Sequence, residues 1–190
     1  AEVRDRPRVE PRWVGVRLIV VVASAHGSAT GVAERIAVRV QESGIDARCR
    51  TFADLGSASD CDALVLGSAV HNRQWLPESD RAIEAAGDCL GGLPLWLFSV
   101  SSVGATTSVL SDRVAAFIRP RTPEPMTVER LRRTRTVRDH RWFAGAVGPG
   151  DWPGFGRVVF RLLGGRYGDA RDWADIDRWA DRIVWALTAR

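Results

Sequence analysis

The 190-residue sequence has no lysine and only three cysteines. Its positive charge is carried by 27 arginines, which against 23 acidic residues give a formal net charge of +4. Cys49, Cys61 and Cys89 are widely spaced and odd in number, so they suggest no disulfide framework, and none lies at metal-ligand spacing from a histidine. We therefore expect a cytoplasmic protein with reduced cysteines and no metal site.

The sequence also lacks long hydrophobic runs and nucleoside-triphosphate motifs. Its longest unbroken apolar run, Leu18–Ala23, is far too short to span a bilayer. No GKS, GKT or GxGxxG pattern occurs, which argues against hydrolysis of ATP or GTP. The charged, proline-containing residues 1–14 are unlike a signal peptide, and we expect a flexible tail there. Residues 15–190 are then a single domain, long enough to bury a core without disulfides.

Hydrophobic periodicity predicts alternating strands and helices along this domain. Buried strands are expected at residues 16–23, 45–52, 63–66, 93–98 and 142–147. Helices are expected after the first strand and at about 77–89, 109–118, 128–135, 155–163 and from 172 onward. Asp172 is the expected N-cap of the last helix, with Asp175 at position N3. This order predicts a three-layer α/β domain with a parallel sheet, helices on both faces and an insertion at about 106–141.

The strand–loop–helix between Leu18 and Arg39 is the strongest candidate for a binding site. Its loop is rich in small and hydroxyl residues, and the first backbone N–H groups of the following helix have no partner inside the helix. The helix dipole also favours an anion at this end. With no lysine in the loop, Ser24, Ser28 and Thr30 predict a cradle for one phosphate monoester. The alternative is that these residues only cap the helix.

Five segments of the sequence resemble segments of a known family. The run SAHGSATGVAERIA resembles the phosphate loop and first helix of flavodoxin-like proteins, and ALVLGSAVHNRQWLPES and LWLFSVSSVG resemble their two flavin loops. HRWFAGAV and GDARDWADIDRWA resemble the fifth strand and last helix of the subfamily that includes menaquinone-dependent protoporphyrinogen dehydrogenases. The resemblance implies a flavodoxin-like fold with five parallel strands in the order 2-1-3-4-5, and the cofactor FMN.

The resemblance also implies which residues would bind FMN. The first loop would surround the phosphate, and the second and third loops would flank the flavin ring. Carried over, these residues are Ser24, His26, Gly27, Ser28, Thr30, Ser68, Val70, His71, Trp75, Ser99, Ser101, Ser102 and Gly104. Trp75 would either stack on the ring or anchor the helix that follows it. Ala29 stands where the family usually has a threonine, so the loop has one hydroxyl fewer unless Thr30 replaces it.

The function implied is electron transfer, or catalysis as a small FMN-dependent oxidoreductase, with a redox partner protein or a quinone as partner. The alternative is a flavodoxin-fold binding or regulatory module that no longer binds flavin. The catalytic residues of such an enzyme are left unassigned, because a bound flavin itself carries the redox chemistry.

Two further segments, one rich in arginine and one apolar, are candidates for contact with other partners. The arginine-rich residues 130–141 have no interleaved aromatic residues, so we expect a solvated helix face and no nucleic acid. An apolar stripe flanked by arginines predicts either core packing or peripheral contact with an anionic membrane. Its residues are Trp152, Phe155, Val159, Phe160 and Leu163, beside Arg157, Arg161 and Arg166.

Overall fold

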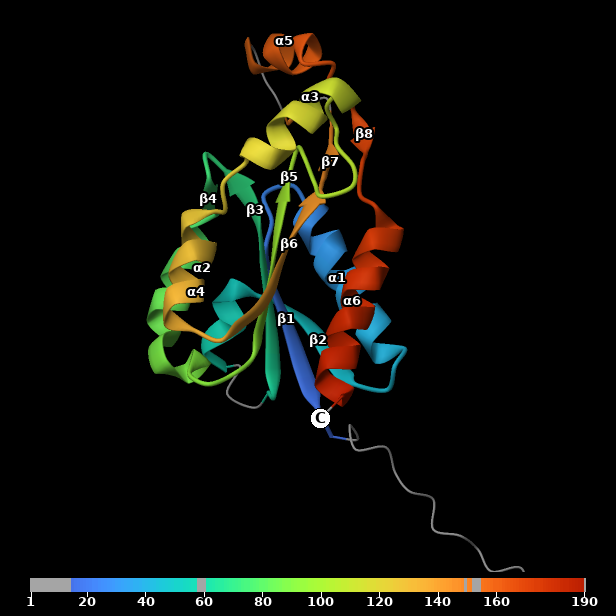
Figure 1. The fold of residues 1–190 in the computed structure, drawn as a ribbon. Helices are drawn as coiled ribbons and strands as arrows, with labels where there is room; N and C mark the ends of the chain where they lie inside the picture. The colour runs from blue at the N-terminus through green and yellow to red at the C-terminus, as the bar shows by residue number, and fades with distance from the viewer. Residues whose placement is uncertain (1–14, 58–60, 149, 152–154, 190) are drawn as a thin grey trace, which may run out of the picture.

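The computed structural model describes residues 15–57, 61–148, 150–151 and 155–189. The expected N-terminal tail, residues 1–14, lies outside the described residues, and so does Trp152 of the predicted apolar stripe. Figure 1 shows a central sheet between two layers of helices, with two further helices above one end of the sheet. Within the described ranges, no helix combines the length and the apolar character needed to cross a bilayer.

Five parallel strands form the sheet, in the spatial order β2-β1-β3-β5-β6. Numbered along the sequence, the parallel strands therefore follow the order 2-1-3-4-5, which confirms the predicted fold class. Two short antiparallel additions lie at the carboxyl end of this sheet: β4 pairs with the end of β3, and β7 pairs with β8. The bounds are β1 (Arg17–Ala23), β2 (Asp46–Thr51), β3 (Ala63–His71), β4 (Gln74–Trp75), β5 (Leu95–Ser101), β6 (Val137–Ala144), β7 (Ala146–Val147) and β8 (Gly168–Asp169).

Helices cover both faces of the sheet and its carboxyl end. In Figure 1, α1 and α6 lie on one face, α2 and α4 on the other, and α3 and α5 above the strand ends. The bounds are α1 (Ser28–Gln41), α2 (Pro77–Ala86), α3 (Asp112–Ile118), α4 (Met126–Thr134), α5 (Phe155–Leu162) and α6 (Trp173–Thr188), with 3-10 turns η1 (Phe52–Ser57), η2 (Gly87–Leu90) and η3 (Arg119–Arg121). Asp172 caps α6 by accepting a hydrogen bond from the backbone N–H of Asp175, as expected.

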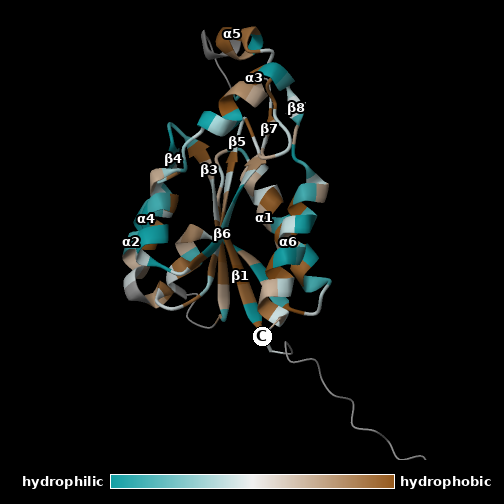
Figure 2. Cartoon of the chain, in the orientation of Figure 1, coloured by the Kyte–Doolittle hydropathy of each residue, from teal (hydrophilic) through white to brown (hydrophobic). Residues whose placement is uncertain are grey.

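The described residues form two main cores and one smaller core. Figure 2 shows that the central strands β1, β3 and β5 are mostly hydrophobic and that the helices around them mix hydrophobic and hydrophilic residues. On the α1/α6 face, the core includes Val20, Phe98 and Trp179, and on the α2/α4 face it includes Leu66 and Leu97. The third core lies above the sheet and consists of Val103, Val109, Leu110, Ala115 and Phe160. We call α3, α5 and the β7–β8 pair, together with this third core, the cap.

The fifth parallel strand differs from the sequence prediction. It was expected at residues 142–147, but β6 begins at Val137 and ends at Ala144, and Gly145 separates it from β7. The reason is that β6 lies at the sheet edge and carries polar side chains that bind neighbouring helices. Asp139 accepts a hydrogen bond from Trp179 of α6, and Arg141 pairs with Asp175 at the start of α6. A search for apolar runs misses such a strand.

Candidate functional site

A cavity of about 370 Å³ opens at the carboxyl ends of the parallel strands. This is the position at which open α/β sheets bind ligands, and the volume falls within the range of small-molecule sites. The loops after β1, β3, β5 and β6 all contribute to its walls. The lining residues are Ser24, Ala25, His26, Ser28, Ala69, Val70, His71, Leu76, Val100, Ser101, Ser102, Gly145, Ala146, Val147 and Asp151.

The N-terminus of α1 forms the polar end of this cavity. Gly27 adopts a left-handed conformation, with φ of 81°, at the N-cap position, which glycine accepts without strain. The first backbone bond of the helix runs from Gly31 N–H to the Gly27 carbonyl, so the amides before Gly31 have no acceptor inside the helix. One of them, the N–H of Ala29, donates to Ser24 Oγ at 3.2 Å. The geometry is that of a helix-terminal anion site.

Ser28 joins this helix end to the segment that follows β6. Its Oγ accepts a hydrogen bond from the N–H of Ala146 at 2.8 Å. The hydroxyl hydrogen of Ser28 is still available for donation, because the bond from Ala146 uses only a lone pair. Gly145 lies so close that a Cβ atom there would be 2.8 Å from Ser28 Oγ. The loop after β6 therefore packs directly against the phosphate cradle.

An ionisable pair lies at the same end of the cavity. The Nδ1 atom of His26 is 3.9 Å from a carboxylate oxygen of Asp151. The other oxygen of Asp151 accepts a hydrogen bond from the N–H of Gly148 at 2.6 Å, which holds the carboxylate in place. Asp151 adds negative charge where the helix end favours an anion, and His26 adds positive charge only when it is protonated.

The remaining wall of the cavity is mostly apolar. Of its described lining residues, only the two histidines carry rings. The aliphatic and small lining residues suit the faces of a flat heterocycle, because they exclude water without competing for hydrogen bonds. They are Ala69, Val70, Leu76, Val100, Ala146 and Val147. The residues present thus fit a phosphate-bearing aromatic group such as FMN, with hydroxyls and amides at one end and hydrocarbon at the other.

The structure brings about half of the sequence-predicted residues together at this cavity. Those that line it are Ser24, His26, Ser28, Val70, His71, Ser101 and Ser102. Gly27 supplies the turn at the start of α1, as described above. Thr30, Ser68, Trp75, Ser99 and Gly104 do not line the cavity.

Trp75 is a core residue, so its predicted role as a stacking surface is wrong. Only 2% of its surface is exposed, its ring lies 6.4 Å from that of Phe52, and its Nε1 atom donates to Ser99 Oγ at 2.8 Å. The alternative prediction, that it anchors the following helix, agrees with its place two residues before α2. Ser68 helps to hold the same turn, because its Oγ accepts a hydrogen bond from the N–H of Leu76.

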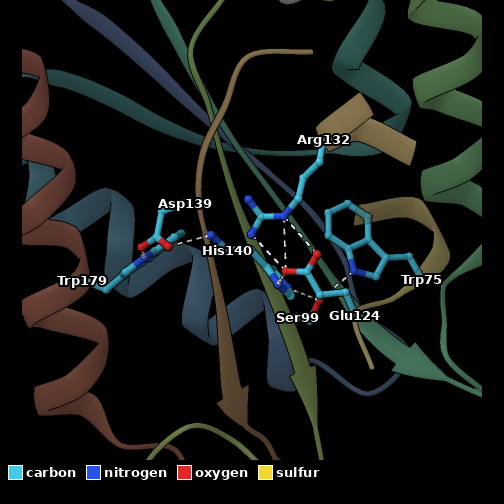
Figure 3. A network of polar contacts seen from close by, with 7 residues as sticks. All are labelled: Trp75, Ser99, Glu124, Arg132, Asp139, His140 and Trp179. Carbon is cyan, nitrogen blue, oxygen red and sulfur yellow. Dashed lines mark hydrogen bonds and ion pairs between the residues drawn. The ribbon is translucent and has the colours of Figure 1, made fainter. Parts of the chain in front are cut away.

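Ser99 belongs to a buried polar network below the cavity (Figure 3). Trp75 Nε1 can only donate, so Ser99 Oγ accepts from it and directs its own hydrogen to His140 Nε2, at 2.9 Å. His140 then carries its proton on Nδ1, which lies 3.1 Å from Glu124 Oε1. Arg132 donates two hydrogen bonds to the Glu124 carboxylate, at 2.9 and 3.0 Å.

The electrostatics of this network favour a neutral imidazole and a charged carboxylate. Burial lowers the pKa of His140 below its ordinary 6.5 and outweighs the attraction of Glu124, which acts in the opposite direction. Burial alone would raise the pKa of Glu124, but the hydrogen bonds from Arg132 and His140 and the charge of Arg132 bring it below its ordinary value. The network resembles a serine–histidine–carboxylate arrangement in its order, but Ser99 has no exposed surface and cannot reach a substrate.

The two other residues outside the cavity have different surroundings. Thr30 lines a separate hollow of about 560 Å³ at the ends of β1 and β2, together with Glu34 and Cys49. Ala29 is fully buried in the α1 core, and Thr30 does not line the cavity, so Thr30 does not replace the missing hydroxyl there. Gly104 packs against the backbone of Ala144, where a Cβ atom would collide with the amide nitrogen.

The arginine-rich segment 130–141 is largely neutralised within the fold. Its partners are carboxylates and carbonyls on neighbouring elements. Arg130 pairs with Asp80 and Glu84, Arg132 with Glu124, Arg133 with Glu129, Arg141 with Asp175, and Arg135 donates to the carbonyl of Gly87. The expected solvated helix face is wrong in part, because residues 130–134 belong to α4 but residues 137–141 belong to β6, and most of these arginines bind partners within the fold.

The sequence prediction missed the wall contributed by the loop after β6. Gly145, Ala146, Val147 and Asp151 line the cavity, although the resemblance placed the flavin only against the first three loops. The available signal was the glycine-rich run GAVGPGD directly after a strand, which is typical of a loop that approaches a ligand or another backbone closely.

With this geometry established, comparison with known proteins defines the class of the molecule. A profile of the flavodoxin domain matches residues 19–150, which is more than half of the chain. The chain therefore belongs to the flavodoxin domain family, and this membership implies a flavin cofactor.

Solved structures with the same fold share little sequence with this protein. A cysteine-to-serine mutant of the flavodoxin from Pseudomonas aeruginosa is 12% identical, with a TM-score of 0.57 over 92% of this chain and 100% of that one. Oxidised flavodoxin 1 from Bacillus cereus is 15% identical, with a TM-score of 0.53 over 88% and 97%. An oxidoreductase from Corynebacterium diphtheriae is 14% identical, with a TM-score of 0.52 over 92% and 98%. Such identities show the fold alone. A comparison with curated proteins gave no match.

Proposed function

We propose that the protein binds FMN in the cavity at the carboxyl ends of its strands and exchanges electrons through it. The observation that supports this most directly is the cradle at the start of α1. There the left-handed Gly27, the hydroxyl of Ser28 and amides without helical acceptors face one end of an otherwise apolar cavity. A phosphate fits the cradle and a flat ring fits the apolar part.

The residues of this site divide into two tasks. Ser24, Ser28 and the helix amides hold the phosphate with neutral donors, and the N–H of Ala146 polarises the Ser28 hydroxyl for that donation. Val70 and Val100 exclude water from the ring. When bound, FMN would supply reversible redox chemistry, and the protein sets its orientation and its electrostatic surroundings.

The finer assignment that we propose is a quinone-linked oxidoreductase of the protoporphyrinogen dehydrogenase type. Its support is the cap, which adds a third hydrophobic core beside the cavity and brings Val147 into the cavity wall. This arrangement provides an apolar approach for a quinone or another flat substrate. The test is anaerobic reduction of the FMN-loaded protein followed by mixing with a soluble quinone. Reoxidation at a rate no higher than with free FMN would contradict this assignment.

The main experiment compares FMN with riboflavin, which lacks the phosphate. On addition of FMN, the purified protein should gain a flavin absorption spectrum. It should bind FMN at least about tenfold more tightly than riboflavin, since one charge-assisted hydrogen bond to the phosphate contributes more than about 1.4 kcal/mol. Ser28→Asp keeps an acceptor for the N–H of Ala146 but repels a phosphate. We expect it to weaken FMN binding at least about tenfold and to leave riboflavin binding within about threefold.

Thr30→Ala is the matched control, because Thr30 lies outside the cavity and should leave both affinities unchanged. Equal loss of FMN and riboflavin binding in Ser28→Asp would show that the phosphate lies elsewhere.

A flavodoxin-fold binding module without flavin is the second candidate function. The observation in its favour is the carboxylate of Asp151, which lines the same cavity as the phosphate cradle. Asp151→Asn removes this charge and should tighten FMN binding by up to about 1 kcal/mol. A protein that binds neither FMN nor riboflavin, before and after this substitution, would support the module and refute the flavoprotein.

A further inference from the structure

The cap has an exposed apolar helix face that the proposed FMN site does not use. On α5, Phe160 is 1% exposed and packs into the third core, which fixes one side of the helix against the rest of the cap. Leu162 is 80% exposed and Val158 is 52% exposed. These two residues are four positions apart and therefore share one face of the helix. Leu163, directly after α5, is also partly exposed.

The position of α5 makes this face accessible to a flat surface. Figure 1 shows α5 at the extreme end of the molecule, far from the C-terminus and beyond the carboxyl ends of the strands. The backbone of Leu163 is held by Ser111, whose N–H and hydroxyl both lie within hydrogen-bonding distance of its carbonyl. The apolar face therefore belongs to a helix at a tip of the fold.

Positive charge also lies around this tip. Residues 112–121 and 158–167 contain one acid, Asp112, and five arginines, Arg113, Arg119, Arg121, Arg161 and Arg166. These two segments therefore carry a net charge of +4. On α3, Phe117 is 63% exposed and the guanidinium of Arg121 lies 4.1 Å from its ring centre. An exposed aromatic ring beside a cation is typical of a membrane–water interface.

From the apolar face and this charge, we propose that the cap docks on the surface of an anionic lipid bilayer. Val158 and Leu162 would enter the region between headgroups and acyl chains, and the surrounding arginines would lie among the anionic headgroups. Charge argues against a second copy of this protein as the occupant, because a symmetric contact through this face would bring two sets of arginines together. The proposal does not depend on flavin binding.

The experiment is co-sedimentation of the full-length protein with vesicles. Vesicles of phosphatidylcholine containing phosphatidylglycerol should bind the protein at low salt, and pure phosphatidylcholine vesicles should bind it at least tenfold less. Binding should weaken as salt rises, because the contribution of exposed charges is screened. The double variant Val158→Ser, Leu162→Ser should lose at least tenfold in affinity, which corresponds to 1.4 kcal/mol. Arg161→Glu should also lose several-fold.

Matched controls use residues of the same kind away from the cap. Val38→Ser changes an exposed valine on α1, and Arg133→Glu changes an exposed arginine on α4, so neither should alter vesicle binding. Circular dichroism verifies that each variant is folded. The proposal is overturned if the cap variants bind like the wild type, if no vesicle composition retains the protein, or if Val158 and Leu162 are instead required for a dimer seen by size-exclusion chromatography.

Discussion

Replacement of Ser99 by alanine tests the buried network most directly. The hydroxyl links Trp75 to His140, because it accepts from the indole at 2.8 Å and contacts the imidazole at 2.9 Å. Ser99 has no exposed surface and Trp75 is 2% exposed. Ser99→Ala would therefore leave one buried donor and one buried acceptor without partners at the same time.

The expected loss of stability follows from these two groups. An unpaired buried polar group costs about 1–3 kcal/mol, so the variant with two such groups should lose about 2–6 kcal/mol of unfolding free energy. A loss of about 3 kcal/mol corresponds to a fall in Tm of about 6–12 °C for a protein of this size. The measurement is urea unfolding followed by far-ultraviolet circular dichroism, together with a thermal scan.

Ser79 provides the control for this prediction. It is equally buried, but its hydroxyl has no hydrogen-bond partner among the described residues. Ser79→Ala removes an unpaired polar atom, so it should be neutral or stabilise the fold by up to about 1 kcal/mol. If the Ser99 and Ser79 variants change the unfolding free energy by equal amounts, within about 0.5 kcal/mol, the network contributes nothing specific and the reasoning is refuted.

Two further predictions concern pH and backbone packing. Because burial lowers the pKa of His140, the unfolded state takes up a proton below about pH 6.5 that the folded state does not, so stability should fall with pH in that window, by at most about 1.4 kcal/mol per pH unit. His140→Gln does not titrate and should flatten this dependence between pH 7.5 and 5 in urea unfolding; an unchanged slope would contradict it. Gly67→Ala places a Cβ atom against the Phe98 ring and should cost more than about 2 kcal/mol. Gly56→Ala has open space and should change the thermal midpoint little; equal effects of the two would contradict the packing argument.

The sequence could predict the strands and the cradle because both depend on local patterns, and the family resemblance supplied the strand order. The buried run of β1, the left-handed turn at Gly27 and the apolar stripe of α1 are contiguous in the sequence, and each has a recognisable residue signature. Parallel strands joined by helices then allow only a few arrangements. The cradle follows, since it is where the first strand meets the first helix.

The rest of the site depends on contacts between distant segments. Trp75 and Ser99 are 24 positions apart, and Ser99 and His140 are 41 apart, so no local spacing indicates that they share one network. An exposed stacking tryptophan and a buried anchoring tryptophan have the same local sequence. The wall after β6 was missed for a similar reason, because Ala146 meets Ser28 across 118 positions of the sequence.

The separate core of the cap has a consequence for motion. Its five buried residues pack with one another above the sheet, apart from the two larger clusters on the sheet faces. A small unit with a core of its own opens at a lower free energy than the whole domain, so its amides should exchange with solvent through local unfolding. Ala146 and Val147 belong to this unit and also line the cavity. A ligand can therefore enter and leave while the central strands stay folded. Deuterium exchange would show weaker protection of the amides in α3 than of those in β1.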